Sequence, residues 1–168
     1  MDKKFVKVGT LDLSNEEMVV VTDPCYSVAQ HLNMTAKVRK GVYDVLVEVK
    51  TTNFGERVSR LAILNKNYDM DYLSPDNGII SCSVGVDSGT IGIFALNYFD
   101  SVQNDDNWYE DNVVNWGNGQ KWNLCDLNGI ISEAGYGDGL YFVYVYENKT
   151  RHTIAVEIDF NVKGINEE

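Results

Sequence analysis

Three glycines surround one carboxylate in the stretch Gly135-Tyr136-Gly137-Asp138-Gly139, directly before an apolar aromatic segment. Glycine readily adopts positive φ, which a tight hairpin requires, so part of this pattern is explained by backbone geometry. Glycines also leave main-chain N–H groups approachable, and successive N–H groups can bind the oxygens of an anion. The motif therefore predicts a hairpin whose loop contributes to a ligand site.

Arg57 stands at the very start of an apolar strand-like segment. Strict alternation along that segment places Arg57 on the side of Leu61 and Ile63, which is the expected core side. A guanidinium in that position needs a carboxylate or a ligand anion as its partner. The carboxylates available in predicted turns are Asp23, Asp87 and Asp138. Both a brace between two loops and an anion site fit this pattern.

The predicted ligand site adds aromatic walls to these polar groups, because aromatic rings stack on the ring of a nucleotide-like ligand. We expect it to lie at one end of a sheet. Its members are Asp23, Tyr26, Arg57, Asp87, Ser88, Tyr136, Gly137, Asp138, Gly139 and Tyr141. None of these residues is assigned a catalytic role, and no cofactor or metal is expected.

Short strand-like segments follow one another along the chain, separated by turn residues. In residues 41–50, for example, Tyr43, Val45 and Val47 alternate with polar residues, as in a half-buried strand. The predicted strands are 5–13, 16–23, 41–50, 57–65, 79–86, 89–96, 129–134, 140–147 and 152–160. Segment 140–147 is apolar on both faces, which predicts a central strand covered on both sides.

This pattern predicts a mostly β fold, an antiparallel β-sandwich or partly open barrel with one or two short helices, in a single domain spanning residues 1–168. The two helical candidates are residues 26–32 and residues 105–116, of which the second begins with acidic residues that suit a helix N-terminus. It belongs to an acidic, aromatic insert at about 100–123. There we expect Trp108, Val113 and Trp116 to pack over one end of the sheet.

Composition limits the classes of partner. The formal net charge of −11 disfavours long-range attraction to a nucleic-acid polymer. The apolar runs are too short to cross a membrane and the N-terminus has no apolar signal segment, so we expect a cytoplasmic protein. The three cysteines, Cys25, Cys82 and Cys125, are widely spaced, which predicts buried free thiols rather than disulfides or a zinc site.

The order of these motifs resembles a group of uncharacterised bacterial and phage-borne proteins that are classed together as a domain of unknown function. The resemblance covers roughly residues 19–160 and rests on Asp23-Pro24-Cys25-Tyr26, on Val86-Asp87-Ser88-Gly89 and on the glycine motif at 135–139. It implies the fold and the grouping of these turns, and it implies no reaction. It also implies a bacterial host, whose cytoplasm is the expected location.

Three functions fit the sequence. The first is a non-enzymatic protein that binds a small anionic or nucleotide-like ligand, with sequestration of a bacterial defence signal by a phage-encoded protein as one use. The second is a metal-assisted hydrolase that uses Asp23, Asp87 and Asp138, although His31 and His152 lie outside the recognisable turns. The third is a protein-binding inhibitor or immunity-type module that uses the acidic insert. Homo-oligomerisation is compatible with all three.

Overall fold

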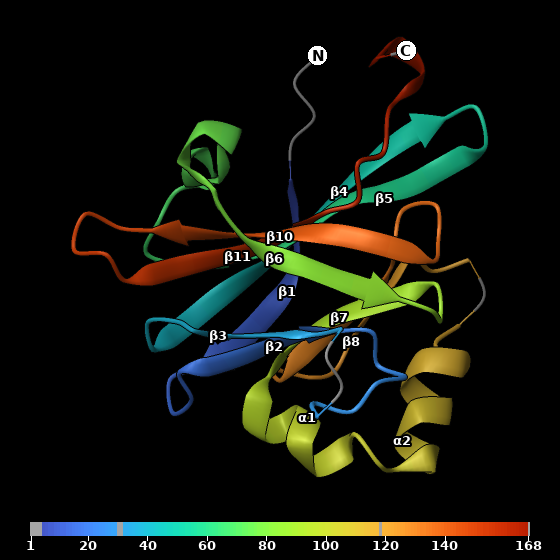
Figure 1. Cartoon of the computed structure of the whole chain (residues 1–168), viewed down its shortest axis with the longest axis horizontal. Coiled ribbons are helices and arrows are strands. Elements are labelled where there is room, and N and C mark those ends of the chain that lie inside the picture. Colours follow the sequence, from blue (N-terminus) through green and yellow to red (C-terminus); the bar gives the residue numbers. More distant parts are fainter. Residues whose placement is uncertain (1–4, 30–31, 118, 168) are drawn as a thin grey trace.

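The computed structural model describes residues 5–29, 32–117 and 119–167, and it contains two antiparallel sheets (Figure 1). Sheet A has the strand order β1-β4-β5-β11-β10-β6, and sheet B has the order β3-β2-β7-β9-β8. The strands of sheet A are β1 (Val6–Leu13), β4 (Gly41–Thr52), β5 (Gly55–Asn65), β6 (Ile79–Val86), β10 (Gly139–Glu147) and β11 (Thr153–Asp159). Those of sheet B are β2 (Met18–Thr22), β3 (Met34–Lys37), β7 (Thr90–Ala95), β8 (Trp122–Leu124) and β9 (Gly129–Glu133).

The antiparallel sandwich is confirmed, and neither sheet closes into a barrel. All nine predicted strands are present, while β3 and β8 were not predicted.

The main core lies between the two sheets. Side chains at alternate positions of β4, including Tyr43 and Val45, are fully buried against β2 and β7 residues such as Val19 and Ile93. The alternation predicted for residues 41–50 is therefore confirmed on its inner face. Each buried aliphatic side chain of this kind contributes about 1.5–3 kcal/mol of burial free energy, so this core is the main source of stability.

Helices cover the outer face of sheet B. They are α1 (Leu96–Val102), α2 (Asp106–Tyr109) and a π-helical turn at Glu110–Val114. Trp108 and Val113 pack with Phe94 and Phe99 in a second cluster, and Trp108 donates a hydrogen bond from Nε1 to Tyr98 Oη at 2.7 Å. The helical and packing predictions for residues 105–116 are thus confirmed. Within the described residues, no helix is long and apolar enough to cross a membrane.

The other helical prediction, residues 26–32, is wrong where it can be checked. The described residues, 26–29 and 32, lie in turns, a bend and irregular backbone, and residues 30 and 31 lie outside the described residues. The backbone there is held by polar contacts, since Asn33 Nδ2 donates to the carbonyls of Ser27 and Val28 at 3.1 Å. Side-chain hydrogen bonds of this kind compete with helical ones.

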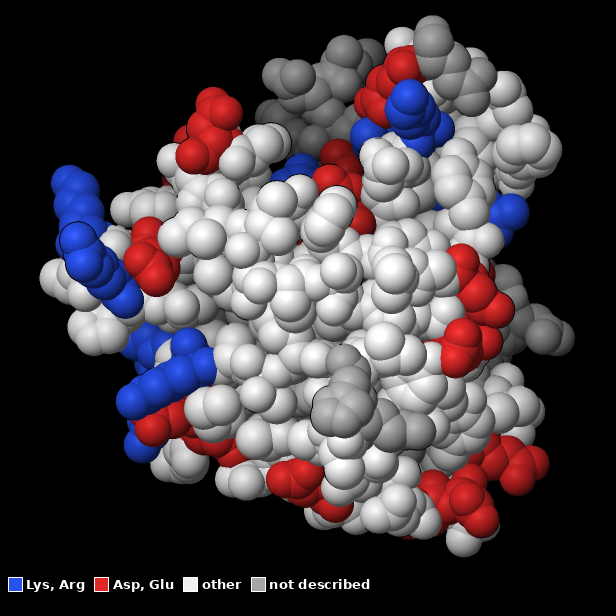
Figure 2. Space-filling model, viewed as in Figure 1, with Lys and Arg blue, Asp and Glu red and all other residues white. Residues whose placement is uncertain are grey.

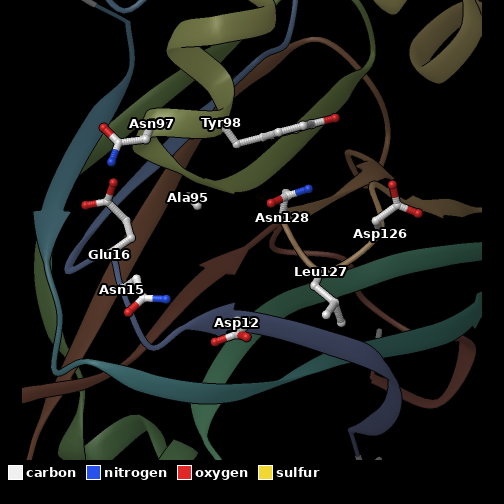
Figure 3. A pocket seen from close by; sticks show the side chains of 9 residues that line it. All are labelled: Asp12, Asn15, Glu16, Ala95, Asn97, Tyr98, Asp126, Leu127 and Asn128. Carbon is white, nitrogen blue, oxygen red and sulfur yellow. The ribbon is translucent and has the colours of Figure 1, made fainter.

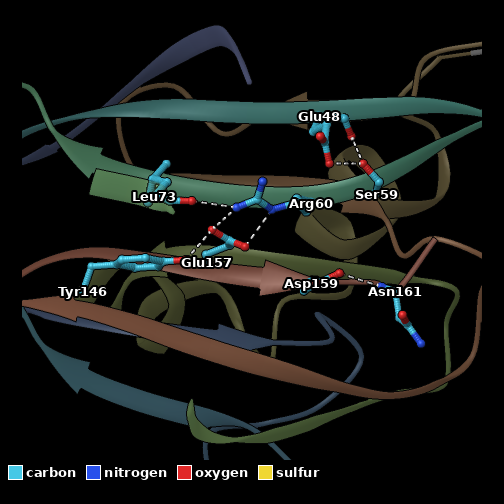
Figure 4. Close-up of polar contacts among 8 residues, drawn as sticks. All are labelled: Glu48, Ser59, Arg60, Leu73, Tyr146, Glu157, Asp159 and Asn161. Atoms are coloured by element: carbon cyan, nitrogen blue, oxygen red, sulfur yellow. Dashed lines mark hydrogen bonds and ion pairs between the residues drawn. The ribbon is translucent and has the colours of Figure 1, made fainter. Parts of the chain in front are cut away.

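A buried ion pair organises the outer face of sheet A (Figure 4). Arg60 donates to both oxygens of Glu157 at 2.8 Å, and Tyr146 donates its hydroxyl to the same carboxylate at 2.9 Å. Arg60 also donates to the carbonyl of Leu73, which belongs to a 3₁₀ turn at Met70–Leu73. The Glu157 carboxylate therefore links three strands, and Arg60 fixes the covering turn.

The far end of the same face is not covered. Leu140 is 71% exposed and Phe142 is 54% exposed, and both lie on β10. The prediction that residues 140–147 are covered on both sides is therefore wrong for this half of the strand, because β10 lies next to the edge strand β6 and the covering turn packs only on Tyr146 and its neighbours. Figure 2 shows the result as a broad face without charged side chains.

Candidate functional site

The predicted cluster around Asp23 exists, and it is held together by that carboxylate. Asp23 follows the end of β2 and is fully buried. Its Oδ2 accepts hydrogen bonds from the main-chain N–H groups of Asp87 and Ser88 at 2.7 Å, and its Oδ1 accepts from the Ser88 hydroxyl at 2.7 Å and from the Cys25 N–H at 2.9 Å. Four donors thus satisfy the buried carboxylate, which forms no ion pair within the described part of the chain.

Tyr26 and Cys25 complete this cluster. The Tyr26 hydroxyl donates to Asp87 Oδ2, and this hydrogen bond is the main reason why the pKa of Tyr26 is raised. Cys25 as a residue is exposed, which contradicts the predicted burial. Although the residue as a whole is exposed, partial desolvation of the thiol, followed by its hydrogen bond with Asp23, raises the pKa of Cys25 to about 12. A thiol with that pKa is protonated at neutral pH and is a poor nucleophile. Of the other cysteines, Cys125 is buried as predicted and Cys82 is partly buried.

The glycine motif forms the turn beside this cluster. Gly135 has φ +52° and packs so closely on Phe160 that a Cβ would lie 2.7 Å from the Phe160 Cβ, while Gly137 has φ +110°. Tyr141 donates its hydroxyl to the Gly137 carbonyl at 2.5 Å and to the Ala134 carbonyl at 3.1 Å. Tyr141 therefore anchors the turn and is not the free wall of a pocket.

Asp138 lies at the same end of the sandwich. Its Oδ1 is 4.0 Å from the position that a Cβ on Gly89 would occupy, so it borders the Asp87–Gly89 turn as expected. Gly139 pairs with Val86 in the sheet, and Tyr136 is 52% exposed. The structure thus brings Asp23, Tyr26, Asp87, Ser88 and Asp138 into one region.

Arg57 does not belong to that region, and the prediction that it faces the core is wrong. The pairing of β4 with β5 shifts between Glu48 and Val49, so Ser59 is an extra residue and Val58 joins Leu61 in the core. Such a bulge reverses the side on which every earlier residue lies. Arg57 pairs with Lys50 near the tip of the hairpin and donates to the Phe54 carbonyl at 3.4 Å.

The Asp23 cluster therefore works as a brace between loops. Both Asp23 oxygens are occupied by donors from the chain itself, which makes the carboxylate a poor ligand for a cation. Among the described residues, no group of three or more His, Cys, Asp and Glu side chains is arranged to hold a metal ion. The metal-assisted hydrolase gains no support from this donor set.

A basic pocket lies at the opposite end of β2. Its cavity of about 510 Å³ is formed by the residue before β2, the link from β3 to β4, and the turn between β10 and β11. The lining residues are Glu17, Lys37, Val38, Arg39, Lys40, Arg151, His152 and Thr153. Figure 2 shows Lys and Arg side chains gathered along the left edge, where Figure 1 places the β10–β11 turn and the β3–β4 link.

Main-chain contacts join these three segments. The Val38 N–H donates to the Glu17 carbonyl at 2.7 Å, and the Arg39 N–H donates to the Thr153 carbonyl at 2.9 Å. The first bond ties the link to the β2 side of the sandwich and the second ties it to β11. The walls of the pocket are therefore fixed relative to one another.

The β10–β11 turn is also ordered by one side chain. Asn148 Oδ1 accepts hydrogen bonds from the N–H groups of Thr150 and His152 and from the Thr150 hydroxyl, at 2.9–3.0 Å. His152 Nδ1 contacts the Thr150 hydroxyl at 2.8 Å, which leaves Nε2 for another partner. Arg151 has φ +62°, an uncommon conformation for a residue with a side chain. The turn thus presents Arg151 and His152 from a defined backbone.

Most cations of this pocket are not neutralised. Within residues 5–29, 32–117 and 119–167, Arg39, Lys40 and Arg151 form no ion pair, and only Lys37 reaches a carboxylate, at 3.7 Å from Glu17. Arg39 donates instead to the Tyr68 hydroxyl at 3.2 Å. Unpaired cations around one cavity attract anions, most strongly phosphate groups that arginine binds through two parallel hydrogen bonds.

A larger cavity of about 670 Å³, between β1, α1 and the β8–β9 turn, has the opposite character (Figure 3). Its polar lining consists of carboxylates, amides and one phenol, and no cation lines it among the residues that the structure describes. These residues are Asp12, Asn15, Glu16, Asn97, Tyr98, Asp126 and Asn128. It cannot attract an anion, so it is not the predicted ligand site.

Sequence reasoning missed the basic pocket, although a signal was present. Residues 37–40 read Lys-Val-Arg-Lys, and residues 149–152 read Lys-Thr-Arg-His. These two short runs hold five of the 14 basic residues in an acidic chain, and each lies beside a strand end. His152, which was set aside as lying outside the turns, is in fact at the end of the β10–β11 turn, while His31 lies outside the described residues.

No protein family, no curated protein and no solved structure matches the chain. The resemblance to the bacterial and phage-borne group therefore stays a prediction.

Proposed function

We propose that this protein is a non-enzymatic binder of a small anionic ligand, and that the ligand lies in the basic pocket. The observation that carries this proposal is the set of three cations, Arg39, Lys40 and Arg151, that surround one cavity and form no ion pair within the described residues, in a chain whose net charge is −11. Any net attraction for an anion must come from a local excess of positive charge, because the rest of the molecule repels anions. The Asp23 cluster offers no cation.

The proposal keeps the ligand class expected from the sequence and moves its site to the other end of the sandwich. A protein that binds a nucleotide-like anion without transforming it acts by lowering the free concentration of that anion. Sequestration of a bacterial signalling nucleotide in the host cytoplasm is the specific use that we propose, and the sequence resemblance to phage-borne proteins supports it.

Binding of inorganic pyrophosphate, measured by isothermal titration calorimetry at low salt, tests the site. We expect Arg151→Ala and Arg39→Ala each to weaken binding about tenfold, which corresponds to about 1.4 kcal/mol. Arg151→Lys should recover only part of the loss, because lysine lacks the planar fork. Lys163→Ala is the matched control, since Lys163 is exposed and lies outside the pocket.

Arg57→Ala distinguishes the two ends of the molecule. It should leave the affinity for pyrophosphate unchanged if the basic pocket is the site. If Arg57→Ala lowered the affinity for pyrophosphate as much as Arg151→Ala does, the ligand site would include Arg57, as predicted from the sequence. Absence of binding to the unmodified protein would contradict the proposal.

A further inference from the structure

The basic pocket contains one carboxylate, and this residue bears on the kind of anion that fits. Glu17 lies directly before β2 and lines the cavity together with the cations. Its Oε1 is 3.7 Å from Lys37 Nζ, and the two side chains are 44% and 72% exposed. A contact that is so long and exposed neutralises little of either charge, so the Glu17 carboxylate keeps its capacity to accept hydrogen bonds.

A carboxylate inside an anion site opposes the binding of an anion. Like charges a few ångströms apart repel each other even in a partly solvated pocket. The arrangement becomes favourable when the ligand also carries a hydroxyl or amino group that donates to Glu17. Thr153, which also lines the pocket, supplies a neutral polar group that can bind a ligand hydroxyl.

The volume of the cavity points the same way. At about 510 Å³ it falls within the range of roughly 300–1,000 Å³ that is typical of sites for small organic molecules, and it is many times larger than a water-sized void. An inorganic phosphate would occupy a small part of it. The remaining space suits an organic group attached to the anion.

We infer that the ligand is an organic phosphate with hydroxyl groups, of the sugar-phosphate or nucleotide kind, whose phosphate faces Arg39, Lys40 and Arg151 and whose hydroxyls donate to Glu17. This inference rests on the proposed function of the same pocket. Glu17 is then a specificity-determining residue: it weakens binding of simple anions and favours anions that bear a donor.

The test compares three probes by calorimetry: inorganic phosphate, butyl phosphate and ribose 5-phosphate. Butyl phosphate has an organic group without hydroxyls, so it separates size from hydrogen bonding. The unmodified protein should bind ribose 5-phosphate about tenfold more tightly than butyl phosphate. Glu17→Gln should tighten binding of inorganic phosphate and butyl phosphate and should reduce the preference for the ribose compound, because a neutral amide oxygen accepts a weaker hydrogen bond than a carboxylate does.

Two further variants keep the result interpretable. Lys37→Met removes the long contact with Glu17 and also one cation of the pocket, so it should weaken binding of all three probes by a similar factor and leave the ratio between ribose 5-phosphate and butyl phosphate in place. Glu17→Asp keeps the charge on a shorter side chain and should reduce the preference without tightening phosphate binding. Both residues are well exposed, so the fold is not at risk.

The outcomes separate the two proposals. If Glu17→Gln tightens all three probes by the same factor, Glu17 only repels anions, and the inference is wrong while the proposed function stands. If the unmodified protein prefers butyl phosphate or shows no preference, the inference is likewise wrong. If none of the probes nor pyrophosphate binds, the proposed function itself fails.

Discussion

Asp23 and the basic residues illustrate two opposite ways of using charge at the level of single residues. The Asp23 carboxylate is fully buried and accepts four hydrogen bonds from neighbouring loops. Both of its oxygens therefore stabilise the fold and are not available to a ligand. Arg151 and Lys40 are exposed and unpaired within the described residues, so their charge remains available to a ligand. A polar side chain whose hydrogen-bonding atoms are all paired within the protein is a poor candidate for ligand binding, even when its residue type is common in binding sites.

Cys25 gives a test of this environment. Because its pKa is raised to about 12, the fraction of thiolate at pH 8 is far lower than for an ordinary cysteine. We expect iodoacetamide to alkylate Cys25 about a hundredfold more slowly in the folded protein than in urea, as measured by peptide mass spectrometry. Between pH 7 and 10 the rate in the folded protein should keep rising, whereas the rate in urea should level off near pH 9.

The raised pKa of Cys25 also determines how the stability of the folded protein depends on pH. The folded state favours the protonated thiol, so this contribution is fully present below the unfolded pKa of about 9 and is lost as the pH rises towards 12. A rate that levels off near pH 9 in the folded protein would show that the thiol is not desolvated. Cys25→Ser should leave anion binding intact, because Cys25 does not line the basic pocket.

At the level of secondary-structure elements, a bulge and an ion pair determine what sheet A presents. The shift in pairing at Glu48 and Val49 places Arg57 away from the core, while Arg60, two residues after Val58, meets Glu157 on the outer face. The Arg60 side chain is 18% exposed and that of Glu157 is 3% exposed. Removing two charged groups from water costs free energy, so a buried ion pair is stable only when its hydrogen bonds are short and well aligned.

This pair yields a prediction for stability. Glu157→Gln should destabilise the protein by about 3 kcal/mol, because it leaves a buried guanidinium without a charged partner. Arg60 keeps its bond to the Leu73 carbonyl and its stacking over Phe5, at 4.4 Å from the ring centre, which places the cost at the lower end of the usual range. Chemical denaturation in urea measures the effect.

Two comparisons check that explanation. Replacing both Arg60 and Glu157 by leucine should cost much less than Glu157→Gln, since neither charge is then left unpaired. Lys7→Met, which breaks the exposed pair of Lys7 with Asp44, should cost less than about 1 kcal/mol. Equal losses for Glu157→Gln and the double replacement would show that packing, not charge, dominates this site.

Across the whole molecule, charge is unevenly distributed. The chain carries 25 acidic and 14 basic residues, and the basic pocket gathers Lys37, Arg39, Lys40 and Arg151 at one end of the sandwich. Excess negative charge destabilises a compact state through self-repulsion, and dissolved salt screens that repulsion. The same screening weakens attraction between the pocket and an anion.

Salt should therefore act in opposite directions on stability and on binding. Raising the sodium chloride concentration should raise the midpoint of thermal unfolding, measured by calorimetry, and should lower the affinity for pyrophosphate. Potassium glutamate serves as a control for a specific effect of chloride in the pocket. A midpoint that falls as salt is added would mean that local ion pairs outweigh the net charge of −11.

The sequence by itself determined the nine predicted strands and the mostly β, antiparallel class, and it left a sandwich and a partly open barrel as alternatives. Alternation with a period of two is a local property, so Tyr43 to Val49 and the other runs could be assigned without knowledge of their partners. The turns at Asp23, Asp87 and Asp138 could also be grouped, because each follows or precedes a strand end. The gathering of Asp23, Asp87 and Ser88 is confirmed by their hydrogen bonds.

Only the tertiary structure decided which end of the molecule carries positive charge. The bulge at Ser59 depends on the pairing of β4 with β5, and one extra residue reversed the side predicted for Arg57. The pocket joins residues 37–40 to residues 151–153, which are more than a hundred positions apart. Their contact follows from the order of the strands and the stacking of the two sheets. Main-chain hydrogen bonds join the β3–β4 link to β11, and no local sequence pattern predicts that contact.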